Sequence, residues 1–196
     1  MSFSSTDNCQ PISPQKTIIR NALASDVSDI AETVVYSFYN YSGVFNLLYP
    51  VLQLTVGEDL RFRLHSSSTL YRCLVATIID EQSRPSIAGT VEVSLKNSFW
   101  SPYSQYPYIS NLAVKNTYRR RGIARQLLEK CESIASSWGY DAVQLHVLNQ
   151  NDSAKKLYLG SGYRIIKKET SWNGFFPYGS SRLLLRKKIM TSQKIE

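Results

Sequence analysis

The chain has 196 residues, of which 43% are hydrophobic and 19% charged, a composition typical of one soluble globular domain and not of a disordered chain. Its 23 basic and 15 acidic residues give a formal charge of +8, which favours a nucleic acid, a phospholipid or a phosphate-bearing cofactor as ligand. Three widely spaced cysteines and two histidines exclude a fully paired disulfide scaffold and argue against a metal site. The apolar stretches are too short to cross a membrane.

The hydrophobic pattern divides the chain into an N-terminal tail and one domain. Residues 1–15 are rich in Ser and Pro and lack periodicity, so we expect a flexible tail before a single domain over residues 16–190. In chain order, the pattern predicts a strand at 17–21, helices at 26–38 and 47–64 with an interruption at Pro50, strands at 71–80, 87–96 and 108–114, a helix at 122–138, a strand at 143–147, a helix at 154–161, and strands at 163–170 and 182–189. This order predicts an α/β fold in which helices cover both faces of a mixed sheet.

The predicted strand at 108–114 changes its apolar face part-way along. Ile109 stands at an odd position, whereas Leu112 and Val114 stand at even ones. A β-bulge near Ser110 and Asn111 is the simplest cause. Such a bulge frees backbone groups, with which a linear ligand containing amides could pair. An irregular edge strand without a ligand explains the same pattern.

An arginine-rich segment, YRRRGIAR at 118–125, separates this strand from the strongly amphipathic helix. A helix N-terminus binds anions through free N–H groups, and Gly122 allows close approach of a ligand. Arginines at this end of a helix oppose its dipole unless an anion binds there. We therefore interpret the segment as a pyrophosphate site, with a solvated basic turn as the alternative.

Two spaced motifs resemble the acetyl-CoA-binding core of the GNAT acyltransferases. The first, [RQ]-x-x-G-x-[GA], is filled by Arg119, Gly122 and Ala124. The second, N-x-x-A-x-x-L-Y-x-x-x-G-[FY], is filled by Asn151, Ala154, Leu157, Tyr158, Gly162 and Tyr163. The close match covers residues 108–163, and the chain is also similar to ribosomal-protein and eukaryotic N-terminal acetyltransferases and to cyanobacterial and plastid GNATs. The resemblance implies the GNAT fold, with a mostly antiparallel sheet and a bulged, splayed central strand.

The resemblance also implies acetyl-CoA as the cofactor and a role for each motif. The backbone of 112–114 would pair with the pantetheine arm, and residues 120–125 would wrap the pyrophosphate. The cofactor-binding residues implied are Leu112, Ala113, Val114, Arg119, Arg120, Arg121, Gly122, Ile123, Ala124, Arg125, Asn151 and Tyr158. Tyr158 would lie near the sulfur and protonate the leaving thiolate, since a phenol has a proton to give. Without the motif, Tyr158 would be read as an ordinary core aromatic.

Direct attack of an amine on a thioester needs a group that accepts the amine proton. His146 alternates with the apolar residues of its strand and so lies on the opposite sheet face. Several eukaryotic N-terminal acetyltransferases, which this segment resembles, have His at this position and Tyr at the start of the bulged strand, here Tyr108. We predict that His146 and Tyr108 act together as the base through ordered water. Glu92 is the second candidate, and a half-buried His146 satisfied by a neighbour is the structural alternative.

The pKa of the acceptor amine favours a protein N-terminus as the substrate. An α-amine has a pKa of about 8 and a lysine amine about 10.4, so deprotonation at pH 7 costs about 1.4 and about 4.6 kcal/mol. An imidazole with a pKa of about 6.5 matches the first better, although lysine stays open. Aromatic segments flank the expected acceptor side, and the residues predicted to bind the peptide are Phe38, Tyr39, Tyr41 and Trp172.

Three other functions compete with N-terminal acetylation. The aromatic segments suit a small arylalkylamine acceptor, the arginine turn suits a nucleic-acid-binding module, and a catalytically inactive module would hold CoA as a structural ligand. Of the partners, we expect peptide N-termini or lysine side chains rather than nucleic acid or membrane. We expect a cytoplasmic location, with the plastid stroma as the alternative.

Overall fold

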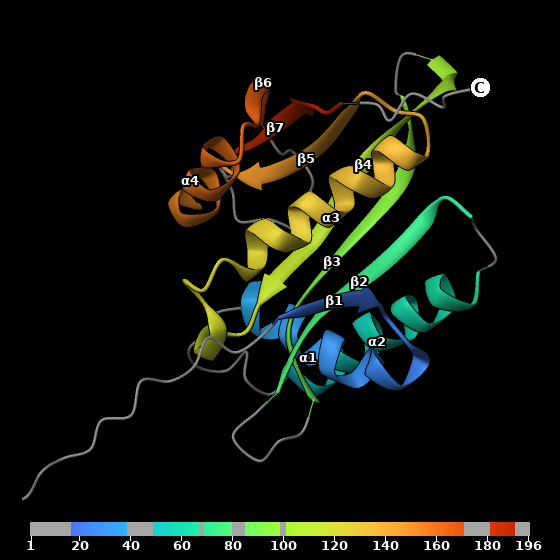
Figure 1. Ribbon diagram of the computed structural model, residues 1–196, viewed down its shortest axis with the longest axis vertical. Coiled ribbons are helices and arrows are strands. Elements are labelled where there is room, and N and C mark those ends of the chain that lie inside the picture. Colours follow the sequence, from blue (N-terminus) through green and yellow to red (C-terminus); the bar gives the residue numbers. More distant parts are fainter. Residues whose placement is uncertain are drawn as a thin grey trace, which may run out of the picture.

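The computed structural model describes residues 17–38, 49–66, 69–79, 85–98, 101–170 and 181–190. In these ranges one sheet runs in the strand order β1-β2-β3-β4-β5-β7-β6 (Figure 1). The strands are β1 (Ile18–Asn21), β2 (Tyr71–Ile79), β3 (Pro85–Ser98), β4 (Ser101–Val114), β5 (Ala142–Leu148), β6 (Arg164–Thr170) and β7 (Ser181–Lys188). The helices are α1 (Val27–Phe38), α2 (Tyr49–His65), α3 (Ile123–Ser137) and α4 (Asp152–Gly160). The element order is the predicted one, and the α/β fold is confirmed.

Two elements differ from their predicted extents. Strand β4 begins at Ser101 instead of Tyr108. Its first part pairs with the end of β3, where Asn97 lies opposite Gln105 and Ser98 opposite Ser101. This pairing overrides the weak strand propensity of a segment with two prolines. Pro50 does not interrupt α2 but lies in its first turn, where a proline loses no helical hydrogen bond. The predicted tail at 1–15 lies outside the described residues.

Two apolar clusters hold helices on opposite faces of the sheet. The larger includes Leu74, Val91, Leu128 and Leu145 and packs α3 against the strands. The smaller includes Val34, Leu60 and Val75 and packs α1 and α2 on the other side, as Figure 1 shows. Successive residues of β2 alternate between the two clusters, as the two-residue period of a strand requires. Among the described helices, none is both long and apolar enough for a transmembrane span.

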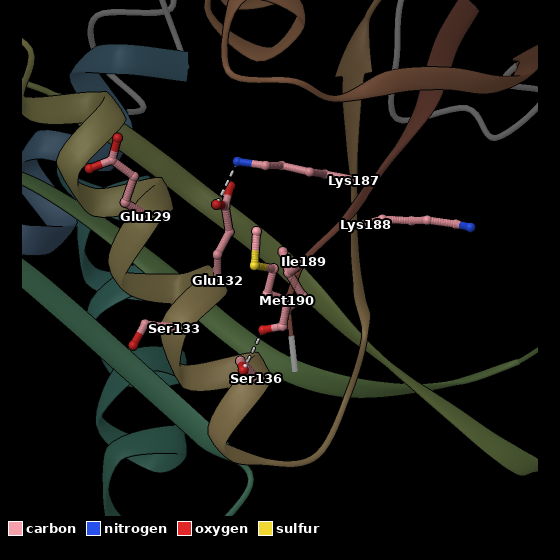
Figure 2. Close-up of a pocket in the computed structure, with 8 residues that line it drawn as sticks. All are labelled: Glu129, Glu132, Ser133, Ser136, Lys187, Lys188, Ile189 and Met190. Atoms are coloured by element: carbon pink, nitrogen blue, oxygen red, sulfur yellow. Dashed lines mark hydrogen bonds and ion pairs between the residues drawn. The ribbon is translucent and has the colours of Figure 1, made fainter. Parts of the chain in front are cut away.

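Helix α3 is also fastened to the end of β7. Lys187 Nζ lies 2.6 Å from Glu132 Oε2, and Ser136 Oγ donates to the Met190 carbonyl at 2.8 Å. Figure 2 shows both contacts around an open hollow of about 440 Å³. This hollow is lined by residues within 129–136 of α3 and by residues 187–190, none of which belongs to the site described next.

The central strands β4 and β5 are parallel and separate soon after they meet. They pair only at Tyr108 with Gln144 and Ile109 with Leu145, and Figure 1 shows them diverging from there. On the other edge of β4, the register with β3 shifts between Thr90 and Glu92. The predicted bulge and the predicted splayed strand are both confirmed.

Candidate active site

The bulge in β4 is held by a buried carboxylate on β3. Asn111 has a left-handed backbone with φ 52°, which asparagine tolerates better than most residues. Its Nδ2 donates to Glu92 Oε1 at 2.7 Å. The other oxygen of Glu92 accepts from the Tyr71 hydroxyl at 3.0 Å and lies 2.8 Å from a guanidinium nitrogen of Arg63 on α2. Glu92 is 3% exposed, so this candidate base has both oxygens engaged in holding the bulge.

A glycine that the sequence reading did not single out lets the two strands approach at the bulge. A Cβ placed on Gly89 would lie 2.8 Å from the carbonyl oxygen of Ala113, which is closer than a methyl group permits. Glycine inside a strand is a recognised sign of close backbone approach. The backbone of 112–114 therefore depends on the absence of a side chain on β3.

The backbone predicted to pair with the pantetheine arm has one unpaired edge. Residues 113 and 114 pair with β3 on one side, whereas β5 pairs with β4 no further than Ile109 in the described chain. The Arg119 Nε donates to the Val114 carbonyl at 3.2 Å and ties the next turn to this strand. A linear amide ligand could add to the free edge as a strand would.

The arginine turn leads into α3 through two left-handed residues. Arg120 has φ 64° and Gly122 has φ 77°, and Gly122 caps the helix without a side-chain hydrogen bond. The first turn of α3 contains no acidic residue, so its N–H groups and dipole are not neutralised from within. Ile123 is 2% exposed and packs in the larger apolar cluster, so its side chain cannot contact a ligand.

The arginines of this turn have different surroundings. Arg119, Arg120 and Arg121 are exposed, and Arg121 lies 5.5 Å from the Tyr118 ring centroid. Arg125 donates to the Gly160 carbonyl at 3.3 Å and links α3 to the end of α4. Exposed cations, a helix N-terminus without acidic residues and left-handed backbone are the features by which a loop before a helix binds phosphate.

The second motif places Asn151 and Tyr158 on α4. Asn151 caps the helix, since its Oδ1 accepts from the Ala154 backbone N–H at 3.0 Å; the sequence reading had assigned it only to the cofactor. Tyr158 is 8% exposed, and burial raises the pKa of its phenol to about 12, with Tyr108 contributing. Its hydroxyl makes no hydrogen bond to other described residues, although buried tyrosines usually find a partner.

The structure brings His146 and Tyr108, the two residues predicted to act as the base, into direct contact. The Tyr108 hydroxyl lies 2.8 Å from His146 Nδ1, and His146 Nε2 lies 3.2 Å from Glu169 Oε2 on β6. Glu169 also accepts from Arg182 Nε at 2.9 Å and lies 3.3 Å from Lys167 Nζ. Burial raises the pKa of Glu169, but the hydrogen bonds from Lys167 and Arg182 lower it more, so the carboxylate is ionised and can only accept. His146 Nε2 then carries the proton, and Nδ1 accepts from Tyr108.

The charges around this pair favour a neutral imidazole. Burial lowers the pKa of His146, and Arg182 and Lys96 lower it further, against the opposing effect of Glu169. Burial also raises the pKa of Tyr108. Lys96 Nζ lies 3.5 Å from the centroid of the Tyr108 ring. At pH 7 the imidazole is therefore uncharged and able to take a proton.

The residues predicted to bind the peptide cannot be placed against this pair. Phe38 is the last residue of α1, and its side chain lies outside the described part of the chain. Tyr39, Tyr41 and Trp172 also lie outside the described residues.

Comparison with known proteins identifies the family. A sequence model of the acetyltransferase (GNAT) family matches residues 43–163, a range that contains the bulge, the arginine turn and α4. The chain belongs to the GNAT family. The match begins well before the two motifs, so the family likeness extends beyond the close match at 108–163 into the N-terminal half.

Individual GNAT proteins illustrate the likeness. The chain is similar to the Arabidopsis thaliana protein GCN5-related N-acetyltransferase 10, chloroplastic, with 26% identity over 153 residues, which are 74% of this chain and 60% of that relative. It is 27% identical over 125 residues to the thialysine N-epsilon-acetyltransferase of Sus scrofa, covering 63% of this chain and 74% of the relative. The Escherichia coli ribosomal-protein-S18-alanine N-acetyltransferase structure shares the fold, with a TM-score of 0.61, 14% identity and coverage of 92% and 99%.

Three features of the site fit acetyl-CoA, the acyl donor of GNAT enzymes. The free edge of 112–114 suits the amides of pantetheine, and the N-terminus of α3 suits the pyrophosphate. The third feature is Tyr158, a buried residue whose hydroxyl lacks a hydrogen-bond partner among the described residues and which lies on the helix that Arg125 links to α3.

Proposed function

We propose that the protein is an acetyl-CoA-dependent N-acetyltransferase whose acceptor is the α-amine of a protein N-terminus. The observation that carries the proposal is the contact of 2.8 Å between the Tyr108 hydroxyl and His146 Nδ1. The contact lies where β4 and β5 stop pairing, next to the strand edge that fits pantetheine. A proton acceptor therefore stands beside the point at which the thioester would be held.

The donor would be held by backbone more than by side chains. In this proposal the edge of residues 112–114 pairs with pantetheine, and the N–H groups of residues 122–124 with Arg120 and Arg121 bind the pyrophosphate. Acetyl-CoA supplies an activated carbonyl carbon, whose bond to sulfur breaks as the bond to the amine nitrogen forms.

The chain's own residues then move two protons. As the amine nitrogen commits its lone pair to the new bond, its proton passes to the Tyr108 oxygen, directly or through one water, while Tyr108 gives its proton to His146 Nδ1. Glu169 stabilises the resulting imidazolium through Nε2. Tyr158 keeps its proton at neutral pH because of its raised pKa, and this proton neutralises the departing thiolate.

The choice of an α-amine rests on matching of pKa values. A neutral imidazole whose pKa lies below its usual range is a weak base, so it suits an amine that is already partly deprotonated at pH 7. An α-amine costs about 1.4 kcal/mol to deprotonate there, against about 4.6 kcal/mol for lysine. The name of the plant relative further supports the plastid stroma as the location.

A small amine is the second candidate acceptor, favoured by one of the comparisons. The relative from Sus scrofa is named for acetylation of thialysine, a small amine. The chain covers a larger share of that relative than of the plant protein, so this alternative belongs in the same experiment.

Mass spectrometry of a bacterial proteome after co-expression tests the proposal. We expect new acetyl groups on N-termini with the unaltered protein and none with His146→Gln or Tyr108→Phe. Lys130→Met, a change on the exposed side of α3, serves as the control and should behave like the parent. Acetylation confined to lysines, or activity only on thialysine-like amines in a parallel turnover assay, would contradict the proposal.

A further inference from the structure

The sheet face that carries His146 is strongly basic. On β7, Leu183 and Leu185 are buried in the cluster beneath α3, and Lys187 pairs with Glu132 of α3. The alternate residues Arg182 and Arg186 therefore lie on the opposite face, together with His146.

The register extends this face onto β6. Arg164 pairs with Arg186, Lys167 with Leu184, and Glu169 with Arg182, and paired residues share a face. The ion pairs of Glu169 with His146, Arg182 and Lys167 confirm that these side chains meet there.

The acidic side chains near this basic face are already bound by cations. Glu169 accepts from Arg182 and Lys167 and contacts His146, and the buried Glu92 on β3 is bound by Arg63. The segments that follow α1, β3 and β6, residues 39–48, 99–100 and 171–180, contain no Asp or Glu. None of these three segments can therefore supply a carboxylate.

Lys96 on β3 adds a further cation next to Tyr108. Its Nζ lies 3.5 Å from the centroid of the Tyr108 ring, and it makes no ion pair with any acidic residue of the described chain. Burial and repulsion by Arg182 lower its pKa, which shows that its charge is held at a cost. An incoming carboxylate would relieve that cost, whereas a second ammonium group on the acceptor would be repelled.

We infer that Lys96, together with Arg182, binds a carboxylate of the acceptor next to its reactive amine, so that the enzyme prefers N-termini with Asp or Glu among their first residues. This inference rests on the proposed function and names the class of acceptor for the same site. It also excludes polyamines as good substrates, because every additional ammonium meets the same cations.

Three peptides that differ at one position test the inference. Each begins with Ser, carries Glu, Gln or Lys at the second position and is otherwise identical, and kcat/KM is measured by thiol release from acetyl-CoA. We expect the Glu peptide to exceed the Gln peptide by about three- to tenfold, and the Lys peptide to be poorer by a similar factor, the range expected of a partly screened charge pair.

Two charge-reversal variants show whether Lys96 causes the expected order of the three peptides. Lys96→Glu should invert the order of the Glu and Lys peptides. The readout is the ratio of the kcat/KM values within the variant, because Lys96 also contacts the Tyr108 ring and its loss can change the rate on all three peptides. Lys168→Glu makes the same change in net charge on β6, but Lys168 pairs with Leu183 and so lies on the other face; it should keep the parental order.

The outcomes separate the inference from the proposal beneath it. Equal rates on all three peptides with the unaltered protein, or an order unaffected by Lys96→Glu, would overturn the inference and leave N-terminal acetylation standing. Inhibition by an RNA oligonucleotide without any effect of peptide charge would overturn it in favour of a nucleic-acid surface. Absence of acetylation on every peptide would overturn both.

Discussion

Replacement of Glu92 by Gln separates the two residues considered as the base and tests how the bulge is held. The carboxylate is almost fully buried, accepts hydrogen bonds from Asn111 at 2.7 Å and Tyr71 at 3.0 Å, and forms an ion pair with Arg63 at 2.8 Å. The amide of Gln has the same shape as the carboxylate, but an NH₂ group replaces one of the two accepting oxygens. This NH₂ donor would then face one of the donors that now bind Glu92. The substitution also removes the negative charge that is paired with Arg63.

The cost follows from these contacts. Loss of one partner from a buried ion pair costs about 3–5 kcal/mol, and the 30% exposure of the Arg63 side chain argues for the lower part of this range. At about 3 kcal/mol, and about 2–4 °C per kcal/mol for a chain of this size, Tm falls by about 6–12 °C. Because Asn111 loses its anchor, we also expect CoA to bind about tenfold more weakly, the equivalent of one charge-assisted hydrogen bond.

Thermal denaturation and calorimetric titration with CoA measure the two effects, and Glu132→Gln is the matched control. Glu132 is also a carboxylate bound by a tyrosine, Tyr163, and by a cation, Lys187, but it lies on the α3 side of the sheet (Figure 2). Glu132→Gln should therefore lower Tm without weakening CoA binding. If Glu92→Gln kept the parental Tm and CoA affinity but abolished turnover, Glu92 would be the base and our assignment to the bulge would be wrong.

Four further predictions concern the chemistry, the stability and the strand edge. In a pH–rate profile, the acid limb of kcat/KM should lie below pH 6.5, because His146 must be neutral to act and its pKa is lowered. Glu169→Gln removes a group that favours the imidazolium, so this variant should move the acid limb to lower pH. Because the unfolded state takes up the His146 proton more readily, the free energy of unfolding should also decrease as the pH falls below 6.5, and denaturant titrations at several pH values would measure this. Tyr158→Phe should lower kcat by about 10²-fold with little change in CoA affinity, and unchanged kcat would rule out the phenol as proton donor. Gly89→Ala places a Cβ 2.8 Å from the Ala113 carbonyl oxygen, so it should lower both Tm and CoA affinity, whereas a normal CoA titration would show that the strands can move apart.

Local patterns were sufficient to predict the elements and the cofactor region. Periodicities of two and 3.6 residues reflect burial on one face of a strand or helix, so the order of elements could be read directly. The change of apolar face between Ile109 and Leu112 predicted the bulge for the same reason. The arginine turn and the α4 motif could each be recognised because each is a continuous segment of the sequence. A helix N-terminus and the loop before it bind phosphate through neighbouring backbone groups.

The environment of the predicted base was decided by the tertiary structure. His146 and Tyr108 were paired through a family resemblance, but Glu169, Lys96 and Arg182 were not foreseen. These side chains come from three strands far apart in the chain, and they meet only because β6 and β7 take one register beside β5. Glu92 was likewise predicted as an alternative base, whereas the structure pairs it with Arg63 of α2.

The amino-acid sequence alone thus determined the element order, the bulge and the two motifs from which the acyl-donor site is proposed, since each depends on residues that are neighbours along the chain. The charge of the acceptor side, the tautomer of His146 and the role of Glu92 emerged only from the folded chain. They depend on strand register and on which helix covers which part of the sheet, and many distant contacts together determine both.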